Sequence, residues 1–134
     1  MLNVKIIAIQ EHMILRDNLH KISDEFDNYE AFSIPATKST LNITKGRPSG
    51  GISFLWANDL NGVITRVKND SNRVQGIIAN MNDIKYLFIN SYFPTDPRVE
   101  NFDEHELQCT LQKIRFISES HEYDNIIPVS YTHL

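Results

Sequence analysis

The chain has 134 residues, which is enough for one domain and too few for two ordinary ones. Its 41% hydrophobic and 22% charged residues are typical of a soluble globular protein, and no apolar stretch approaches the roughly 20 residues needed to span a bilayer. The net charge of −4 argues against a generally basic coat for nucleic acid. The single cysteine, Cys109, excludes an internal disulfide and suits a reducing compartment, so we expect an intracellular protein, nuclear or cytoplasmic.

The first third of the chain contains two predicted strands separated by a predicted helix. Five of the six residues 4–9 are apolar and most of these are β-branched, which predicts a short buried strand. Residues 29–34 predict a second strand, which ends at Pro35. Between them, apolar residues recur at spacings of four, three and four, as on one face of an amphipathic helix. These residues are Leu15, Leu19, Ile22 and Phe26.

A polar loop is expected over residues 37–50. No acidic residue occurs between Ala31 and Asn58, whereas the loop carries Lys45 and Arg47. The loop therefore either faces an anion or is an ordinary solvated segment. It lacks the Gly-Lys-Ser/Thr ending of a phosphate-binding P-loop.

The middle of the chain predicts a meander of four short strands, because Asn, Asp and Gly turns separate four apolar runs. These turns imply antiparallel pairing, and residues 58–62 predict a hairpin between the first two strands. The four runs are residues 52–57, 63–68, 73–80 and 85–93.

The last part of the chain predicts a helix followed by a strand. Asp103 with Glu106 three residues later resembles a capping box, and residues 125–127 begin another buried strand. Apolar side chains then mark one helix face, with Cys109 outside it. The face consists of Leu107, Leu111, Ile114 and Ile117. The whole order predicts an α/β layered fold with a mixed sheet and helices over the sheet faces.

Glu11 follows the first apolar strand at a position where a buried charge needs a partner. Two readings of this residue stay open on the sequence alone. The carboxylate either holds a metal ion at the end of the strand, or it lies near the start of the next helix, where the helix dipole favours an acid. His12 follows directly and is expected to support the site or lie at the surface rather than to act as a base.

Three short motifs occur in a recognisable order: Gln10-Glu11 at the end of a strand, Gly50-Gly51 before the meander, and the sequence INSYFP at residues 89–94. Together they resemble the endonuclease/exonuclease/phosphatase superfamily, which has the deoxyribonuclease I-like fold. The likeness is closest to the endonuclease domain of non-LTR (LINE-type) retrotransposons and covers residues 1–127. The resemblance implies a truncated four-layer α/β sandwich, with a mixed sheet and an antiparallel meander.

The resemblance also implies roles for particular residues. Glu11 matches the family's ligand for Mg²⁺ (or Mn²⁺), and Tyr92 matches its active-site tyrosine, whose hydroxyl lies near the attacked phosphate. For Tyr92 the alternative is a packed strand aromatic. Asn90 shares a strand face with Tyr92 and is expected to make polar contacts with DNA. Arg47 and Lys45 are expected to contact the DNA backbone.

The sequence also departs from the family pattern, and these departures bear on whether the chain is active. The family's upstream metal-site Asn and its later Gly-Asp-x-Asn motif do not occur in this sequence. Residues 128–134 resemble translated cloning sequence, and we expect a foreign tail there. The complete domain would nick DNA and leave a 3′ hydroxyl that primes reverse transcription, whereas the isolated fragment is expected to be inactive. The alternatives are a same-fold phosphatase of lipid or small-molecule phosphoesters, and a non-catalytic binding module or inert gene remnant.

Overall fold

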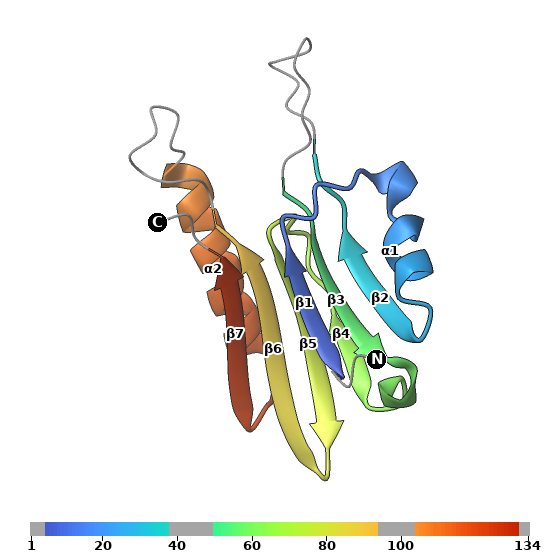
Figure 1. Cartoon of the computed structure of the whole chain (residues 1–134). Coiled ribbons are helices and arrows are strands. Elements are labelled where there is room, and N and C mark those ends of the chain that lie inside the picture. Colours follow the sequence, from blue (N-terminus) through green and yellow to red (C-terminus); the bar gives the residue numbers. More distant parts are fainter. Residues whose placement is uncertain (1–4, 38–49, 94–103, 132–134) are drawn as a thin grey trace.

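The structure, a computed structural model, describes residues 5–37, 50–93 and 104–131 (Figure 1). Strands and helices follow the predicted order along the chain. The elements are β1 (Ile6–Gln10), a 3-10 helix (Arg16–Asn18), α1 (His20–Glu25), β2 (Tyr29–Ile34), β3 (Ile52–Ala57), a second 3-10 helix (Asn58–Leu60), β4 (Ile64–Val67), β5 (Val74–Met81), β6 (Ile84–Tyr92), α2 (Glu104–Ser120) and β7 (Asn125–Tyr131).

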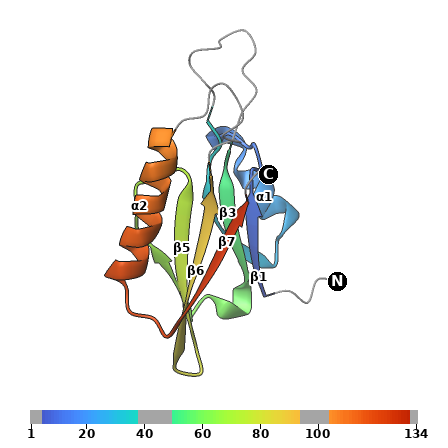
Figure 2. The same ribbon diagram turned by 90° about the vertical axis from the view of Figure 1, so that its left-hand side faces the viewer.

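The strands form two sheets that pack face to face. One sheet has the order β1-β3-β2 and is antiparallel, and the other has the order β4-β5-β6-β7, in which only the β6–β7 pair is parallel. Helix α1 packs against β2, and α2 packs against β5 and β6, so the helices cover opposite sides of the sandwich (Figures 1 and 2). The layers are therefore helix, sheet, sheet and helix, which confirms the predicted four-layer α/β sandwich.

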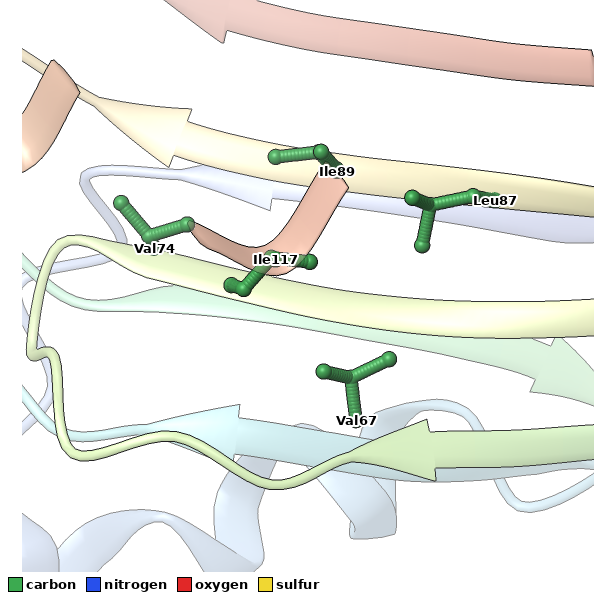
Figure 3. Packing of buried hydrophobic residues seen from close by; sticks show 5 residues of the cluster. All are labelled: Val67, Val74, Leu87, Ile89 and Ile117. Atoms are coloured by element: carbon green, nitrogen blue, oxygen red, sulfur yellow. The ribbon is translucent and has the colours of Figure 1, made fainter. Parts of the chain in front are cut away.

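Two apolar clusters hold these layers together. Phe54, Trp56 and Ile77 pack between the two sheets. A second cluster lies between α2 and the larger sheet, where Ile117 of the helix meets residues of β4, β5 and β6 (Figure 3). Its buried members are Val67, Val74, Leu87, Ile89 and Ile117. Each such fully buried side chain stabilises the fold by about 1.5–3 kcal/mol relative to an exposed one.

The hairpin predicted between the strands now labelled β3 and β4 is wrong. β3 lies in the centre of one sheet and pairs with β1 and β2, whereas β4 pairs with β5 in the other sheet. The segment between them forms the 3-10 helix Asn58–Leu60 and carries the chain from one sheet to the other. All but the last residue of β3 are buried, so this strand needs partners on both edges and cover on both faces.

The apolar stripes of the helices are narrower than predicted. Helix α1 covers six residues, of which only Ile22 is buried. In α2 the buried residues are Thr110 and Ile117, while Leu111, which was expected on the packed face, is 43% exposed. Thr110 tolerates burial because its hydroxyl donates to the carbonyl of Glu106 at 2.8 Å. Asp103 of the predicted capping box lies outside the described residues.

Strand β7 continues through Pro128, within the segment expected to be foreign. In the described part of the chain β7 pairs only with β6, so it is an edge strand, where proline is tolerated. The boundary after residue 127 stays a prediction. Neither described helix combines the length and the apolar character needed to cross a bilayer.

Candidate functional site

The candidate site lies where β1 and β6 end. These two strands belong to different sheets, yet they are in contact, and their C-terminal ends lie at the same end of the sandwich (Figure 1). β1 ends at Gln10, so Glu11 is the first residue beyond it, and Tyr92 is the last residue of β6. The fold thus brings two polar motifs from distant parts of the sequence to one edge.

The structure places the side chains of Glu11 and Tyr92 together. The hydroxyl of Tyr92 donates a hydrogen bond to Oε1 of Glu11 at 3.4 Å, across 81 residues of sequence. Tyr92 is 7% exposed, and Glu11 is half-buried. The two residues that the family resemblance singles out therefore form one polar pair, with the phenol ring held in the sandwich and its hydroxyl next to the carboxylate.

The backbone at Glu11 adopts an uncommon conformation. Glu11 has φ +56° and Met13 has φ +59°, both in the left-handed region that side chains other than glycine rarely occupy. The His12 and Met13 amides donate to the carbonyls of Gly51 and Gly50 at 3.2 and 2.9 Å, which holds the segment in place. Such conformations cost on the order of 1–3 kcal/mol each and cluster at functional sites.

His12 is held as a neutral imidazole by backbone groups on both sides of its ring. Nδ1 accepts from the amide of Ile14 at 2.9 Å, so Nε2 carries the proton and donates to the carbonyl of Ile34 at 3.0 Å. Burial lowers the pKa of His12, partly opposed by its backbone hydrogen bonds with Ile34 and Ile52. Both ring nitrogens are therefore engaged by backbone groups, which ties the segment after β1 to the end of β2.

Gly51 is required by the same arrangement. A Cβ atom at Gly51 would lie 2.3 Å from a carbon of the His12 ring, and its φ of +90° also disfavours any side chain. Gly51 thus lets the His12 imidazole approach the backbone closely, next to Glu11 in the chain.

Arg73, which the sequence did not single out, lies next to Tyr92. Its guanidinium lies 5.3 Å from the centre of the Tyr92 ring, and its Nε donates to Oε1 of Glu106 at 3.1 Å. The amide of Tyr92 also donates to the carbonyl of Arg73 at 2.8 Å. Its Nη1 is buried and has no hydrogen-bond partner. The arrangement places the positive charge of Arg73 over the face of the Tyr92 ring, where the cation and the ring attract each other.

Asn90 has a different role from the direct DNA contact expected of it. It lies on the same face of β6 as Tyr92, as predicted, but its side chain is fully buried between the sheets. Its Oδ1 accepts from Nε2 of Gln10 at 2.8 Å, and its Nδ2 donates to Oε1 of Gln75 at 3.0 Å. Sequence analysis also missed Gln75, whose position in an apolar strand was the available signal. Arg47 and Lys45 lie outside the described residues, so their contacts with DNA stay predictions.

The donor set at this edge fits a hydrated divalent cation. Within residues 5–37, 50–93 and 104–131, no three His, Cys, Asp or Glu side chains are grouped as a protein-only metal cage would require. Mg²⁺ instead keeps several waters and binds proteins through one or two carboxylates together with substrate phosphate oxygens. A single half-buried carboxylate at a strand end, as in Glu11, is consistent with that mode of binding.

Comparison with solved structures establishes the fold. The human Nocturnin catalytic domain with bound sulfate superposes with a TM-score of 0.54 and 12% identity, over 92% of this chain and 50% of that one. A humanized D. rerio TDP2 gives a TM-score of 0.55 and 12% identity, over 94% of this chain and 51% of that one. Both have the deoxyribonuclease I-like fold, which this chain shares over about half their length. No family model and no curated protein matches the sequence.

Proposed function

We propose that this chain is the N-terminal part of a Mg²⁺-dependent phosphodiesterase domain that nicks DNA, similar to a retrotransposon endonuclease. The observation that carries the proposal is the contact between Glu11 and Tyr92, which lie 3.4 Å apart at one end of the sandwich. The shared fold supports a hydrolase of this superfamily, and the retrotransposon likeness comes from the motifs.

Each residue of the pair has a distinct task in this proposal. Glu11 would hold Mg²⁺ (or Mn²⁺), and the bound ion supplies Lewis-acid polarisation of the scissile phosphate. Tyr92 would donate a hydrogen bond from its hydroxyl to a phosphoryl oxygen as negative charge grows there, in place of the hydrogen bond it now makes to Glu11. Arg73, stacked on the Tyr92 ring, adds positive charge next to that anion.

We propose that the chain by itself does not hydrolyse DNA at a useful rate. Nucleophile, base and metal act as a unit in such sites, and the loss of one member removes most of the activity of the whole. The motifs that supply the nucleophile-positioning Asp and Asn in the family do not occur in this sequence. In a complete domain, Glu11→Gln is expected to abolish Mg²⁺-dependent plasmid nicking.

Metal binding is testable on this chain directly. Titration with Mn²⁺ is expected to broaden the NMR signals of Tyr92 and Gly51 first, because both lie beside Glu11. Glu11→Gln keeps the shape of the side chain and removes its charge. Loss of a residue that only hydrogen-bonds a metal ligand lowers metal affinity by about 10-fold or more, so loss of the ligand Glu11 itself should lower the Mn²⁺ affinity of the chain by more than about 10-fold. The matched control is Glu119→Gln, an exposed acid on α2 paired with Arg115 at 2.9 Å. Equal Mn²⁺ affinity in wild type and Glu11→Gln would exclude Glu11 as the ligand.

A non-catalytic module is the second candidate, favoured because no three His, Cys, Asp or Glu side chains are grouped to hold a metal ion in the described part of the chain. The same titration distinguishes the two, once duplex DNA is added in the presence of Mg²⁺. Binding of neither Mn²⁺ nor DNA supports the inert alternative. If the chain binds inorganic phosphate in the presence of Mg²⁺ and duplex DNA does not displace that phosphate, the result supports a same-fold phosphatase.

A further inference from the structure

A directed series of side-chain amides runs through the interior behind Glu11. Nε2 of Gln10 donates to Oδ1 of Asn90 at 2.8 Å, and Nδ2 of Asn90 donates to Oε1 of Gln75 at 3.0 Å. Nε2 of Gln75 in turn donates to the carbonyl of Phe32 at 3.0 Å. Asn90 and Gln75 are both 0% exposed, so bulk water does not reach their side-chain amides. We call Gln10, Asn90 and Gln75 the amide chain.

The amide chain joins strands of both sheets. Nδ2 of Asn90 also lies 3.1 Å from the carbonyls of Ile9 in β1 and Ser53 in β3. With Gln75 in β5 bonded to Phe32 in β2, the side chain of Asn90 in β6 is connected to four other strands. Buried polar groups are costly without partners, so a shift in the register of these strands would leave buried amide groups unsatisfied. These side-chain hydrogen bonds therefore connect the two sheets in the interior of the sandwich.

The amide chain begins at Gln10, immediately before Glu11, the residue on which the proposed function depends. Gln10 is the last residue of β1, and Glu11 follows it with a φ of +56°. On the far side of Glu11, the amides of His12 and Met13 are bonded to Gly51 and Gly50. An unfavourable backbone conformation persists only where its surroundings fix it on both sides. On the strand side, Gln10 is held by its pairing with Ile52 of β3 and by its side-chain bond to Asn90.

We propose that the amide chain is a positioning device that holds the carboxylate of Glu11 beside the hydroxyl of Tyr92. Its members touch neither the proposed phosphate nor the proposed metal; they act through Glu11. Its consequence for metal affinity rests on the proposed function. Its consequence for geometry does not: without the bond between Gln10 and Asn90, the side chain of Gln10 no longer ties the end of β1 to β6, and we expect the carboxylate of Glu11 to shift away from Tyr92.

The test compares two substitutions that each remove one internal side-chain hydrogen bond. Gln10→Met keeps the length of the side chain and removes its donor to Asn90. The matched control is Ser33→Ala, which removes the acceptor of the Ser53 hydroxyl at 2.7 Å and lies outside the amide chain. Three quantities are measured on each full chain: the melting temperature, the NOE between Tyr92 ring protons and Glu11 γ protons without metal, and the dissociation constant for Mn²⁺.

The expected result distinguishes a change in the position of Glu11 from a change in the stability of the fold. Gln10→Met should lose the NOE and weaken Mn²⁺ binding by about 10- to 100-fold, with a melting temperature close to that of Ser33→Ala. Ser33→Ala should keep both the NOE and the affinity. If Gln10→Met does not fold, Gln10→Asn, which shortens the amide by one carbon, is measured in the same way.

Two results overturn the positioning role. One is an unchanged NOE and unchanged Mn²⁺ affinity in Gln10→Met, and the other is the same losses in Ser33→Ala. If wild type fails to bind Mn²⁺ at Glu11, the proposed function fails, while the NOE comparison still decides whether the amide chain positions Glu11.

Discussion

At the scale of single residues, the candidate site depends on small conformational requirements as much as on chemical groups. Glu11 reaches Tyr92 from a backbone conformation that few residues adopt, and His12 is packed against a glycine with no room for a side chain. Sequence motifs identified the Gln-Glu and Gly-Gly pairs, and the structure gives their physical reason. The glycine admits the imidazole, and the imidazole and its neighbours hold Glu11.

Gly51→Ala is expected to destabilise the chain by about 1–3 kcal/mol, because a Cβ at this position combines a left-handed φ with a clash. The clash is with the His12 ring, at 2.3 Å. Gly62→Ala is the control, since nothing lies within 4 Å of a Cβ there. Urea denaturation of both variants measures the difference. Equal free energies of unfolding for the two would contradict the packing of His12 on Gly51.

At the scale of elements, β6 is the strand on which the fold and the site both depend. Its alternate residues face opposite ways: Leu87 and Ile89 pack toward α2, whereas Asn90 and Tyr92 face the other sheet. One strand therefore contributes to the apolar core on one side and to the polar site on the other. Helix α2 supports the site indirectly, since Ile117 packs behind β6 and Glu106 holds Arg73.

The burial of one face of α2 against the sheet predicts how substitutions on this helix change stability. Ile117→Ala is expected to lower the free energy of unfolding by about 2–5 kcal/mol, because a side chain with 0% exposure leaves a cavity. Leu111→Ala, at 43% exposure on the same helix, should change it by less than about 0.5 kcal/mol. Thermal and urea unfolding of the two variants measure these changes. A larger loss of unfolding free energy for Leu111→Ala than for Ile117→Ala would contradict the burial of the Ile117 face of α2.

At the scale of the whole molecule, the chain corresponds to about half the length of the structures that share its fold. Within the described residues, β1 and β7 are each paired on one edge only. Ile126 and Ile127 of β7 are 41% and 38% exposed, and Phe116 of α2 is 58% exposed. Unpaired edges with apolar side chains favour association between molecules.

We expect the isolated chain to self-associate as its concentration rises, and Ile127→Lys to weaken that association by placing a charge on the β7 edge. Ile84→Lys is the control, because Ile84 is similarly exposed, at 41%, at the start of β6. Sedimentation velocity over a concentration series measures the effect. A purely monomeric wild type, or an equal effect of the two substitutions, would contradict this role of the β7 edge.

The sequence by itself determined the order of the strands and helices and the identity of the candidate pair. Short-range periodicity and turn residues set strands such as β2 and β3, whose bounds match the prediction, and the motif order indicated both Glu11 and Tyr92. Only the tertiary structure decided how β3 and β4 separate into different sheets, which side of α2 is buried, and why Asn90, Gln75 and Arg73 matter. Periodicity reports which side of an element is apolar, whereas these outcomes depend on partners far along the chain. Their choice follows from satisfying buried polar groups and from covering both faces of a sheet at once.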